Sequence, residues 1–541
     1  MCMDNATNCD TLAVRLADVV PSFKGKKSRT RCTPHTVNLI AKAFISFFFK
    51  PSKKRRPDPK KTNESITEVL DMVDEEDDEE NVQPEDEMAE DGEGDAVDAG
   101  KAAADEAEVK SVRAQAIKEA AEMFSLKPRA PATRRRPLEM TVAEELAAYG
   151  LFPKVAGFAR RLHDTTIIQE AFAKLVASDN ERRIAENAQK VEEAREKNQK
   201  LEEIEDDLEI VLEQKSALDR RVPTRWDSDM RCLSAHAHFE NPIKQLCAVS
   251  RWKMAKYLLT PDQWSLAENM IPVLEIFESL TKLFSQAEVP LIHQVLPLME
   301  ALEHDLVRVR ADEDLQPVIR IAAHASLIIL GKYYALTDDC PAYSHAILMR
   351  ADKKLQYFRK NPDWKDGDIE QMLQSAKEHW NEDYPDSEPI APPKPTKKKA
   401  KKYASHVQDV VDLENSTPDP SEDTLDAYLN APLVSAEEIK KAGGHCQYWE
   451  EEAKQRPRLA KFAIKYLSAP ASSVDAERAF SNGRLQVNHL QHGMSSQIFK
   501  ARVALHSWDG SPFFPPGTAE KILAARDKRE KQAAKGKGKS D

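Results

Sequence analysis

Four short motifs in this 541-residue sequence contain residue types that could take part in metal-dependent phosphate chemistry. The first places Asp4 and Asn5 at the mouth of a predicted helix. A carboxylate in this position could bind a divalent cation, because hard cations prefer oxygen ligands. Asp and Asn are also common as helix caps and in turns, and the residues alone favour that interpretation.

The second motif is a Cys and a His three residues apart, Cys32 and His35. This spacing suits a shared zinc ion, but a structural zinc site needs four ligands. The other neighbouring pair, His445 and Cys446, is adjacent in sequence and lacks that spacing. Packing in the core is therefore the favoured interpretation of Cys32 and His35, with metal binding as the alternative.

The third motif joins a cation to an aromatic ring at Arg225 and Trp226. An Arg beside a Trp could hold a phosphate and stack an unpaired base, so both are candidate DNA-binding residues. A Trp that opens an amphipathic helix is more often part of the core, and this is the competing interpretation of Trp226.

The fourth motif lies near the C-terminus, where Ser472 and Asp475 resemble a helix capping box. It places Glu477 about one turn into the predicted helix, followed by Phe480. One carboxylate cannot hold a catalytic pair of Mg²⁺ ions, so a metal role for Glu477 needs partner carboxylates from elsewhere. Otherwise Glu477 is an exposed helix residue and Phe480 anchors the helix.

The composition favours helices and excludes several classes of protein. Gly accounts for only 16 residues, which is few for the tight turns of a β-sandwich or barrel. The 7 scattered cysteines do not form a disulfide framework, and a reducing compartment is expected. No apolar run approaches the length of about 20 residues that a membrane span needs, and the first residues lack the apolar segment of a secretory signal.

The net charge of −12 hides a strong segregation along the chain. Residues 71–98 contain 16 acidic residues and no Lys or Arg, so the rest of the chain carries a net charge of +4. Basic runs at Lys53–Lys61 and Lys397–Lys402 suit nuclear import or phosphate contact. A solvating linker is the favoured interpretation of 71–98, with mimicry of nucleic acid toward basic partners such as histones as the alternative.

The pattern of apolar residues divides the chain into folded segments and linkers. The predicted segments are 1–50, folded; 51–137, a disordered basic and acidic linker with a short helix over Val109–Phe124; 138–390, an all-α domain; 391–440, a disordered linker; 441–515, folded; and 516–541, a basic disordered tail. Helix is expected almost throughout 138–220, supported by i,i+4 pairs such as Glu186–Lys190. Within it, residues 181–213 are interpreted as an exposed helix, with a partner-binding coiled coil as the alternative.

Taken in order, the four motifs resemble those of the hAT superfamily of DNA transposases, specifically the copies common in fungal genomes. Asp4-Asn5-Ala6-Thr7-Asn8 resembles D-N-A-S-N, Cys32-x-x-His35 with Asn38-Leu39 resembles C-x-x-H-x-x-N-L, Pro223-Thr224-Arg225-Trp226 resembles P-T-R-W, and Ser472 to Ser481 resembles S-S-x-x-x-E-R-x-F-S. The resemblance covers residues 1–50 and 140–510, excluding the linkers.

This resemblance implies the remnant of an RNase H-like α/β core, interrupted by a large all-α insertion domain. In the family, three carboxylates hold two Mg²⁺ ions for attack on phosphodiesters. Asp4 would be the second carboxylate and Glu477 the third, and Trp226 would steady a flipped base. A C-terminal dimerisation region is also implied. Its candidate dimerisation residues are apolar: Leu459, Phe462, Leu467, Phe480, Leu505 and Trp508.

One departure from the family pattern changes the expected activity. The first catalytic Asp of the family lies well upstream of the D-N-A-S-N segment, whereas only three residues precede Asp4. We therefore expect a mainly α chain with a truncated core, in which Asp4 and Glu477 are an incomplete site. The expectation is a degenerate transposase without catalysis and without a cofactor, since Mg²⁺ is needed only if the site is completed.

Protein dimerisation in the nucleus is the expected function. The expected partner is a second copy or a related transposase chain, with non-specific contact to DNA in addition; neither a membrane nor a small-molecule substrate is expected. One alternative is an active Mg²⁺-dependent transposase or nuclease whose missing Asp comes from an upstream segment. A second alternative is an acidic nuclear scaffold built on residues 71–98.

Overall fold

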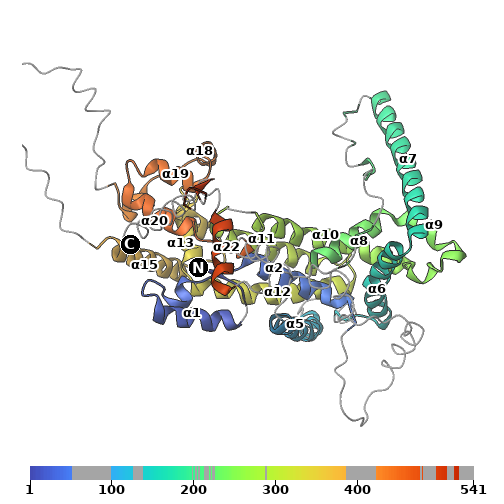
Figure 1. The fold of residues 1–541 in the computed structure, drawn as a ribbon, viewed down its shortest axis with the longest axis horizontal. Coiled ribbons are helices and arrows are strands. Elements are labelled where there is room, and N and C mark those ends of the chain that lie inside the picture. Colours follow the sequence, from blue (N-terminus) through green and yellow to red (C-terminus); the bar gives the residue numbers. More distant parts are fainter. Residues whose placement is uncertain are drawn as a thin grey trace, which may run out of the picture.

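Helices make up most of the described chain, so the predicted mainly α fold is confirmed. The computed structural model describes residues 1–5, 7–50, 99–125, 138–197, 199–200, 204, 207–212, 218–219, 221, 226–286, 289–385, 422–474, 478, 495–508, 517–518 and 520–522. Figure 1 shows an elongated helical body from which one long helix, α7, projects. Most of the predicted linkers and the basic tail lie outside the described residues.

The two strands described are short. Strand β1 (Cys2–Met3) pairs in parallel with β2 (Thr30–Arg31), and the connection runs through α1 (Thr7–Val19) and η1 (Gly25–Ser28). A parallel pair of this length is not stable alone, so it depends on the elements packed around it. The RNase H-like core implied by the resemblance stays a prediction.

Helix α2 (Thr33–Ile45) lies at the centre of the body. Apolar residues occupy most positions from Val37 to Ile45, so the helix must be covered on several sides. Both α10 (Pro261–Phe284) and α12 (Pro317–Ala335) pack against it. The Phe44 and Phe277 ring centroids lie 6.1 Å apart.

Helix α12 also has the length and composition of a membrane-crossing segment. Among the described residues, Pro317–Asp339 is the one segment that meets this test. Residues such as Ile319 and Ala322 are fully buried within the protein. A buried core helix passes the same test, so length and composition are weak evidence here.

Helix α5 (Ala99–Ser125) lies within residues 51–137, where a linker with a short helix was predicted; the rest of this segment lies outside the described residues. The helix expected over Val109–Phe124 is longer than predicted, and it packs on α2 and α12. Val112, Ala116 and Ala120 form a buried stripe at four-residue spacing. Small residues at this spacing permit close packing against a neighbouring helix, which the bulk composition of the segment did not indicate.

Arg113 fixes α5 against the end of α2. Its buried guanidinium donates to the carbonyl oxygens of Ser46 and, at 3.2 Å, of Phe49. It also donates to the Tyr149 hydroxyl at 2.8 Å and lies 5.0 Å from the Phe47 ring centroid. One cation therefore pairs with carbonyl groups that a helix end leaves without intrahelical partners.

The other helices of the body follow at short intervals. They are η2 (Ser46–Phe48), α6 (Val142–Asp164), α8 (Trp226–His238), α9 (Glu240–Cys247), α11 (Ile292–Ala311), η8 (Leu336–Asp339), α13 (Ala342–Leu348), α14 (Lys354–Lys360) and α15 (Asp366–Asp383). Capping boxes at Thr141 and Thr260 begin α6 and α10. The starts of these two helices are thus set by local sequence signals.

Helix α7 (Thr166–Glu196) projects from the body as an arm, drawn at the right of Figure 1. The prediction of helix almost throughout 138–220 is wrong here, because α7 ends at Glu196 and residues 208–212 are not helical. The Asn187 side chain instead pairs with the Glu209 backbone: its amide donates at 2.7 Å and its oxygen accepts at 2.8 Å. The chain thus turns back along the arm, and 181–213 is not one continuous helix.

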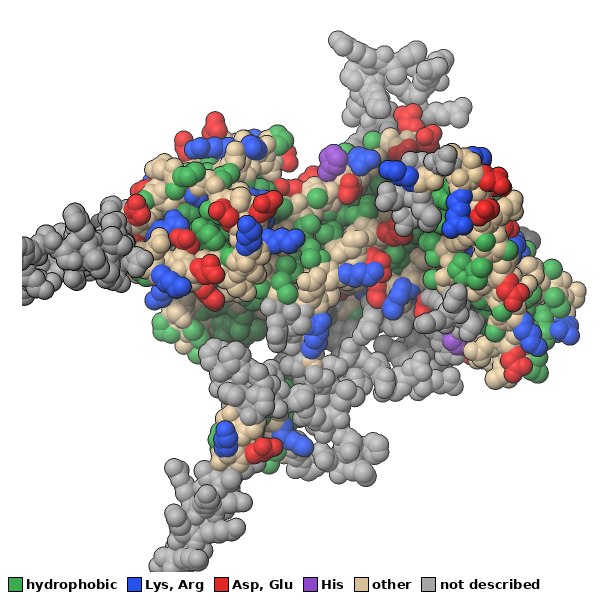
Figure 2. All heavy atoms as spheres, turned by 90° about the horizontal axis from the view of Figure 1, so that it is seen from above, with side chains coloured by type: hydrophobic (Ala, Val, Ile, Leu, Met, Phe, Trp, Pro, Cys, Tyr) green, Lys and Arg blue, Asp and Glu red, His purple; other side chains and the backbone are tan. Residues whose placement is uncertain are grey.

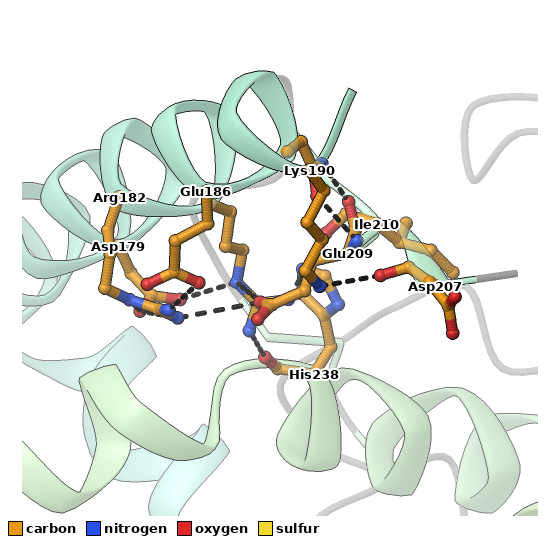
Figure 3. Close-up of polar contacts among 10 residues, drawn as sticks. Asp179, Arg182, Glu186, Lys190, Asp207, Glu209, Ile210 and His238 are labelled. Atoms are coloured by element: carbon orange, nitrogen blue, oxygen red, sulfur yellow. Dashed lines mark hydrogen bonds and ion pairs between the residues drawn. The ribbon is translucent and has the colours of Figure 1, made fainter. Parts of the chain in front are cut away.

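A charge network at the base of the arm holds this returning segment (Figure 3). The buried Asp179 carboxylate accepts from Arg182 at 3.0 Å and from Arg183 at 2.8 Å. Burial raises the pKa of Asp179, but these two hydrogen bonds outweigh burial and the net shift is downward. Arg183 also lies 3.5 Å from the Glu209 carboxylate and donates to the His238 carbonyl at 2.8 Å. The network therefore joins α7, the returning segment and α8.

Replacing Asp179 with Asn should loosen the arm, because a neutral amide cannot balance two guanidinium groups. We expect the free energy of unfolding of this region to fall by about 1–3 kcal/mol. Limited trypsin digestion should then cut faster between α7 and α8. Glu192→Gln is the matched control, since Glu192 forms an exposed pair with Arg195 at 3.3 Å. Equal cleavage rates for the two variants would contradict this role of Asp179.

Candidate functional site

The Asp4 carboxylate lies beside His35, just after β1. Its Oδ1 atom accepts from the Asn5 N–H at 2.8 Å and lies 3.2 Å from His35 Nδ1. The other ring nitrogen, His35 Nε2, lies 3.5 Å from Asp105 Oδ1 of α5. The imidazole is therefore positioned between two carboxylates that come from distant segments of the chain.

Two arginines pair with a further carboxylate nearby, that of Asp10. The buried Arg29 guanidinium donates to the Asp10 carboxylate and to the Asp4 carbonyl. Arg31 Nη2 lies 3.3 Å from Asp10 Oδ1. The Asp10 carboxylate is therefore already paired with two cations, whereas a divalent metal prefers carboxylate oxygens that carry an uncompensated charge. Across the described ranges, no group of three or more His, Cys, Asp or Glu side chains is arranged to hold a metal ion.

Cys32 lies where the second and fourth motifs meet. The Ser473 N–H donates to the buried Cys32 sulfur at 3.5 Å. The adjacent Thr33 N–H donates to the Ala471 carbonyl at 2.9 Å. The start of the fourth motif therefore lies directly against the end of β2, although the two are far apart in sequence.

The environment of the Cys32 thiol is that of a packed core residue. A hydrogen bond from the Cys2 thiol lowers the pKa of Cys32 to about 6, with a further contribution from Ser473, and the same bond raises the pKa of Cys2. His35 pairs with carboxylates instead of sharing a ligand set with Cys32. This placement agrees with the packing interpretation of the second motif.

The remaining motif residues fall into two groups. Arg225, Glu477 and Phe480 lie outside the described residues, so their roles stay predictions. Trp226 opens α8 and is 3% exposed, and its ring meets Phe277 edge-on with centroids 6.0 Å apart. This burial agrees with the core interpretation, because a base could stack on the Trp226 ring only after the core had opened.

Sequence reasoning missed the roles of Asp105 and Arg113. Asp105 was assigned to the disordered linker, and Arg113 lies in the short helix expected over Val109–Phe124, for which no partner was predicted. The stripe of Val112, Ala116 and Ala120 is the signal that could have placed this helix in the core.

The C-terminal helices begin earlier than predicted. Within the segment assigned to the 391–440 linker lie α17 (Leu425–Asn430) and most of α18 (Ala436–Lys441), followed by α19 (His445–Glu452) and α20 (Pro457–Leu467). The buried Asp423 carboxylate accepts from the backbone N–H groups of Arg458 at 3.0 Å and Leu459 at 2.8 Å. Asp423 thereby supplies acceptors for the first turn of α20 from outside that helix.

Two buried aromatic side chains hydrogen-bond these helices to the body. The Trp449 indole N–H donates to the Met349 carbonyl at 2.9 Å. The Tyr428 hydroxyl donates to the Leu348 carbonyl at 3.1 Å. Both acceptors lie at the end of α13, so α17 and α19 are fixed to the same point of the body.

The Lys354 ammonium closes the end of α17. It donates to the carbonyl oxygens of Tyr428, Ala431 and Pro432 at 2.7, 3.0 and 3.0 Å. Burial lowers the pKa of Lys354 to about 8, while the three carbonyls favour the charged form. Lys354 also has a φ of 47°, a left-handed conformation that is strained for a residue with a side chain. A charged donor shared by three carbonyls is strong enough to hold that conformation.

The predicted dimerisation residues separate into two sets. Leu459, Phe462 and Leu467 are fully buried within their own chain, on the inner face of α20. Helix α22 (Ser496–Trp508) instead exposes Leu505 at 42% and Trp508 at 56%. The first set supports the fold, and only the second is accessible to a partner.

Histidines line the contact between the C-terminal helices and the body. The His345 ring of α13 lies 5.3 Å from that of His379 and 4.9 Å from that of Tyr466. The rings of His293 and His445 lie 4.8 Å apart. Burial lowers the pKa of His293 and His345 to about 3 and that of His445 to about 4. These imidazoles are therefore neutral in the folded protein near neutral pH.

Residues 424–508 match the family model of the hAT family C-terminal dimerisation region. The match includes α17 to α20 and α22, a minor part of the whole chain, and it begins before the predicted start at 441. It confirms the resemblance to hAT transposases, while the relation to fungal copies and the truncation stay predictions. No curated protein matches the chain.

Acid should weaken the contact between the matched region and the body. The pKa of an unfolded histidine is about 6.5, and burial lowers the pKa in the folded chain. Below about pH 6.5 the unfolded chain therefore binds more protons than the folded chain, which favours unfolding. Stability is thus fully present above about pH 6.5 and falls as the pH drops toward 4. We expect the melting temperature, followed by circular dichroism, to decrease over this range.

His345→Phe keeps a ring in the same space but cannot titrate, so it should reduce this decrease. His304→Phe is the control, because the His304 side chain is 74% exposed. A pH dependence that is identical in the parent and in His345→Phe would show that His345 does not contribute.

Proposed function

Because the chain carries an hAT-type dimerisation region at residues 424–508, we propose that it self-associates through the exposed face of α22. The buried residues of α17 to α20 hold this region on the helical body. The single observation that carries the proposal is the apolar stripe along α22.

Three large apolar residues follow one face of α22. Ile498, Leu505 and Trp508 stand at positions i, i+7 and i+10, with exposed fractions of 55%, 42% and 56%. At 3.6 residues per turn they fall within about 80° of one another. Exposed apolar side chains gathered on one face are typical of a protein interface.

A second copy of this chain is the proposed partner. In a two-fold dimer each copy presents the same surface, so one apolar stripe is enough to form a self-complementary contact. An exposed Trp such as Trp508 is also a frequent anchor of binding energy. Related transposase chains with an equivalent helix are the alternative partner.

The double variant Leu505→Glu, Trp508→Glu should strongly weaken self-association, because two carboxylates would be buried at the centre of the interface. We expect association to weaken by roughly 30-fold or more, measured by size-exclusion chromatography with light scattering. Ile167→Glu on α7 is the matched control, since Ile167 is 63% exposed and lies outside the matched region. A parent chain that stays monomeric at micromolar concentration contradicts the proposal, as does a double variant that stays dimeric.

The proposal also includes the absence of transposase catalysis. The described residues around Asp4 do not support a site for a pair of Mg²⁺ ions. The Asp4 carboxylate faces the His35 imidazole, and the neighbouring Asp10 carboxylate is already paired with Arg29 and Arg31. Among the described residues, no group of three or more His, Cys, Asp or Glu side chains is arranged to hold a metal ion. The contact with His35 and the hydrogen bond from the Asn5 N–H support a structural role for Asp4. No catalytic step is therefore assigned to this site.

A nicking assay on supercoiled DNA in the presence of Mg²⁺ tests this part. The parent chain should nick no faster than Glu477→Gln, which removes the other candidate carboxylate. If the parent nicks the DNA and Glu477→Gln does not, the result would support the active-enzyme alternative instead.

Nuclear location and non-specific phosphate contact complete the proposal. The basic runs Lys53–Lys61 and Lys397–Lys402 support both, since such runs serve as import signals and as salt-sensitive contacts to nucleic acid. Both runs lie outside the described residues.

A further inference from the structure

The connection between α9 and α10 is a basic and aromatic turn at the right-hand end of Figure 1. Residues 249–258 include η6 (Ser250–Trp252) and η7 (Ala255–Tyr257). They contain three cations, two aromatic residues and no Asp or Glu. Figure 2 shows Lys and Arg interspersed with Asp and Glu over most of the face that it draws. Residues 249–258 therefore bring cations and rings together without an acidic residue in the same segment, in contrast to the mixed charges of that face.

The turn is anchored to the core before any ligand arrives. Met254 and Leu259 are 0% and 4% exposed, and the Cys247 thiol donates to the Met254 carbonyl at 3.3 Å. The Lys154 ammonium of α6 donates to the Leu258 carbonyl at 3.0 Å. A surface that is already ordered loses less conformational entropy on binding.

Each aromatic ring of the turn lies next to a cation. The Arg251 guanidinium carbon is 4.2 Å from the Trp252 ring centroid, and Lys256 Nζ is 5.2 Å from the Tyr257 ring centroid. The two rings are partly buried against the core, while Arg251 and Lys256 are exposed. A guanidinium lying over an indole presents a flat, charged outer surface on which a nucleic acid base can stack.

Lys253 has an unusual backbone conformation between these two pairs. Its φ of 51° and ψ of 35° are left-handed, a region that Gly and Asn adopt far more readily than Lys. Within the part of the chain that the structure describes, neither Arg251 nor Lys253 forms an ion pair with a carboxylate. An exposed cation held at a strained position without an internal partner indicates a role toward a ligand.

We propose that residues 249–258 bind an unpaired nucleic acid strand. Successive bases stack on the Arg251–Trp252 and Lys256–Tyr257 pairs, and Lys253 contacts the phosphate between them. The rings favour nucleic acid over an acidic peptide, because a peptide carboxylate would use the positive charges but not the flat surfaces. This site is independent of the dimer and rests only on the proposed phosphate contact, to which it assigns a surface and a strand type.

The test compares the full-length parent with the double variant Arg251→Ala, Lys253→Gly. Gly suits the left-handed conformation of position 253, so the fold should keep its stability while the two charges are lost. Binding is followed by fluorescence anisotropy with labelled oligothymidylate and oligouridylate of about 20 nucleotides and with a duplex of the same length, between about 50 and 200 mM salt. Arg308→Ala on α11 is the matched control, because the Arg308 side chain is 74% exposed.

We expect the double variant to bind the single strands about 10-fold more weakly at the lowest salt. The slope of log affinity against log salt should fall by about 0.7 for each cation removed. The duplex should be affected less, because its bases are not available for stacking. Oligothymidylate and oligouridylate distinguish DNA from RNA, and a loss with either one supports the proposal. Oligonucleotides that carry 5-bromouracil should crosslink under ultraviolet light to Trp252 or Tyr257.

Basic runs elsewhere in the chain add a background that is the same for the parent and its variants. If the parent binds strands but the double variant matches it, or crosslinks map only outside residues 249–258, the site is overturned while the general phosphate contact stands. If the parent binds no nucleic acid, both fail. Polyglutamate is measured in the same assay. If the double variant binds polyglutamate more weakly than the parent, by the same factor as for the strands, the turn binds acidic peptides instead.

Discussion

Helix α2 is buried on several sides, and each side is covered by a different part of the chain. Helices α10 and α12 come from the middle of the sequence, and α5 follows a long insert. Burial of a side chain such as Phe44 contributes about 1.5–3 kcal/mol to stability. Detaching any of the covering helices would expose a large apolar surface of α2 and lose that contribution. The segments 1–50 and 138–390, which differ in predicted origin, therefore share one hydrophobic core.

Buried polar side chains make the specific links between distant segments of this core. Arg113 donates to carbonyls at the end of α2, Lys354 donates to carbonyls at the end of α17, and Asp423 accepts from the first turn of α20. In each case the side chain pairs with backbone groups that a helix terminus leaves without partners. Leaving such a buried group unpaired costs about 1–3 kcal/mol, so these contacts fix where each helix ends as well as which segment it meets.

Local signals in the sequence were sufficient for the helices whose burial follows from their own pattern. Ile271, Leu274 and Phe277 have the spacing of an amphipathic helix, and they lie in the core-facing part of α10. Contacts between distant residues followed no such rule. Lys190 has the spacing of a helical ion pair with Glu186, yet its ammonium donates to the Asp207 carbonyl at 2.7 Å (Figure 3). The returning segment supplies a partner that spacing along one helix cannot reveal.

The candidate site shows the same division. Residue types and spacing selected Asp4, Cys32 and His35, and the structure places all three near the end of the short strand pair. Spacing could not indicate that Asp105 would face His35, because the helix that carries Asp105 lies beyond an insert of biased composition. It also left both interpretations of Trp226 open, since an exposed and a buried Trp at a helix start look alike in one sequence.

The contacts of Asp423, Lys354 and Trp449 set limits on how this chain can be divided experimentally. A fragment cut at 424 would begin one residue after the carboxylate that caps α20. It would also leave behind the ammonium that closes α17 and the carbonyl that accepts from the Trp449 indole. A fragment cut at this family boundary would therefore lack contacts of α17, α19 and α20, and we expect an expression product to need Asp423, α13 and α14 together with the C-terminal helices.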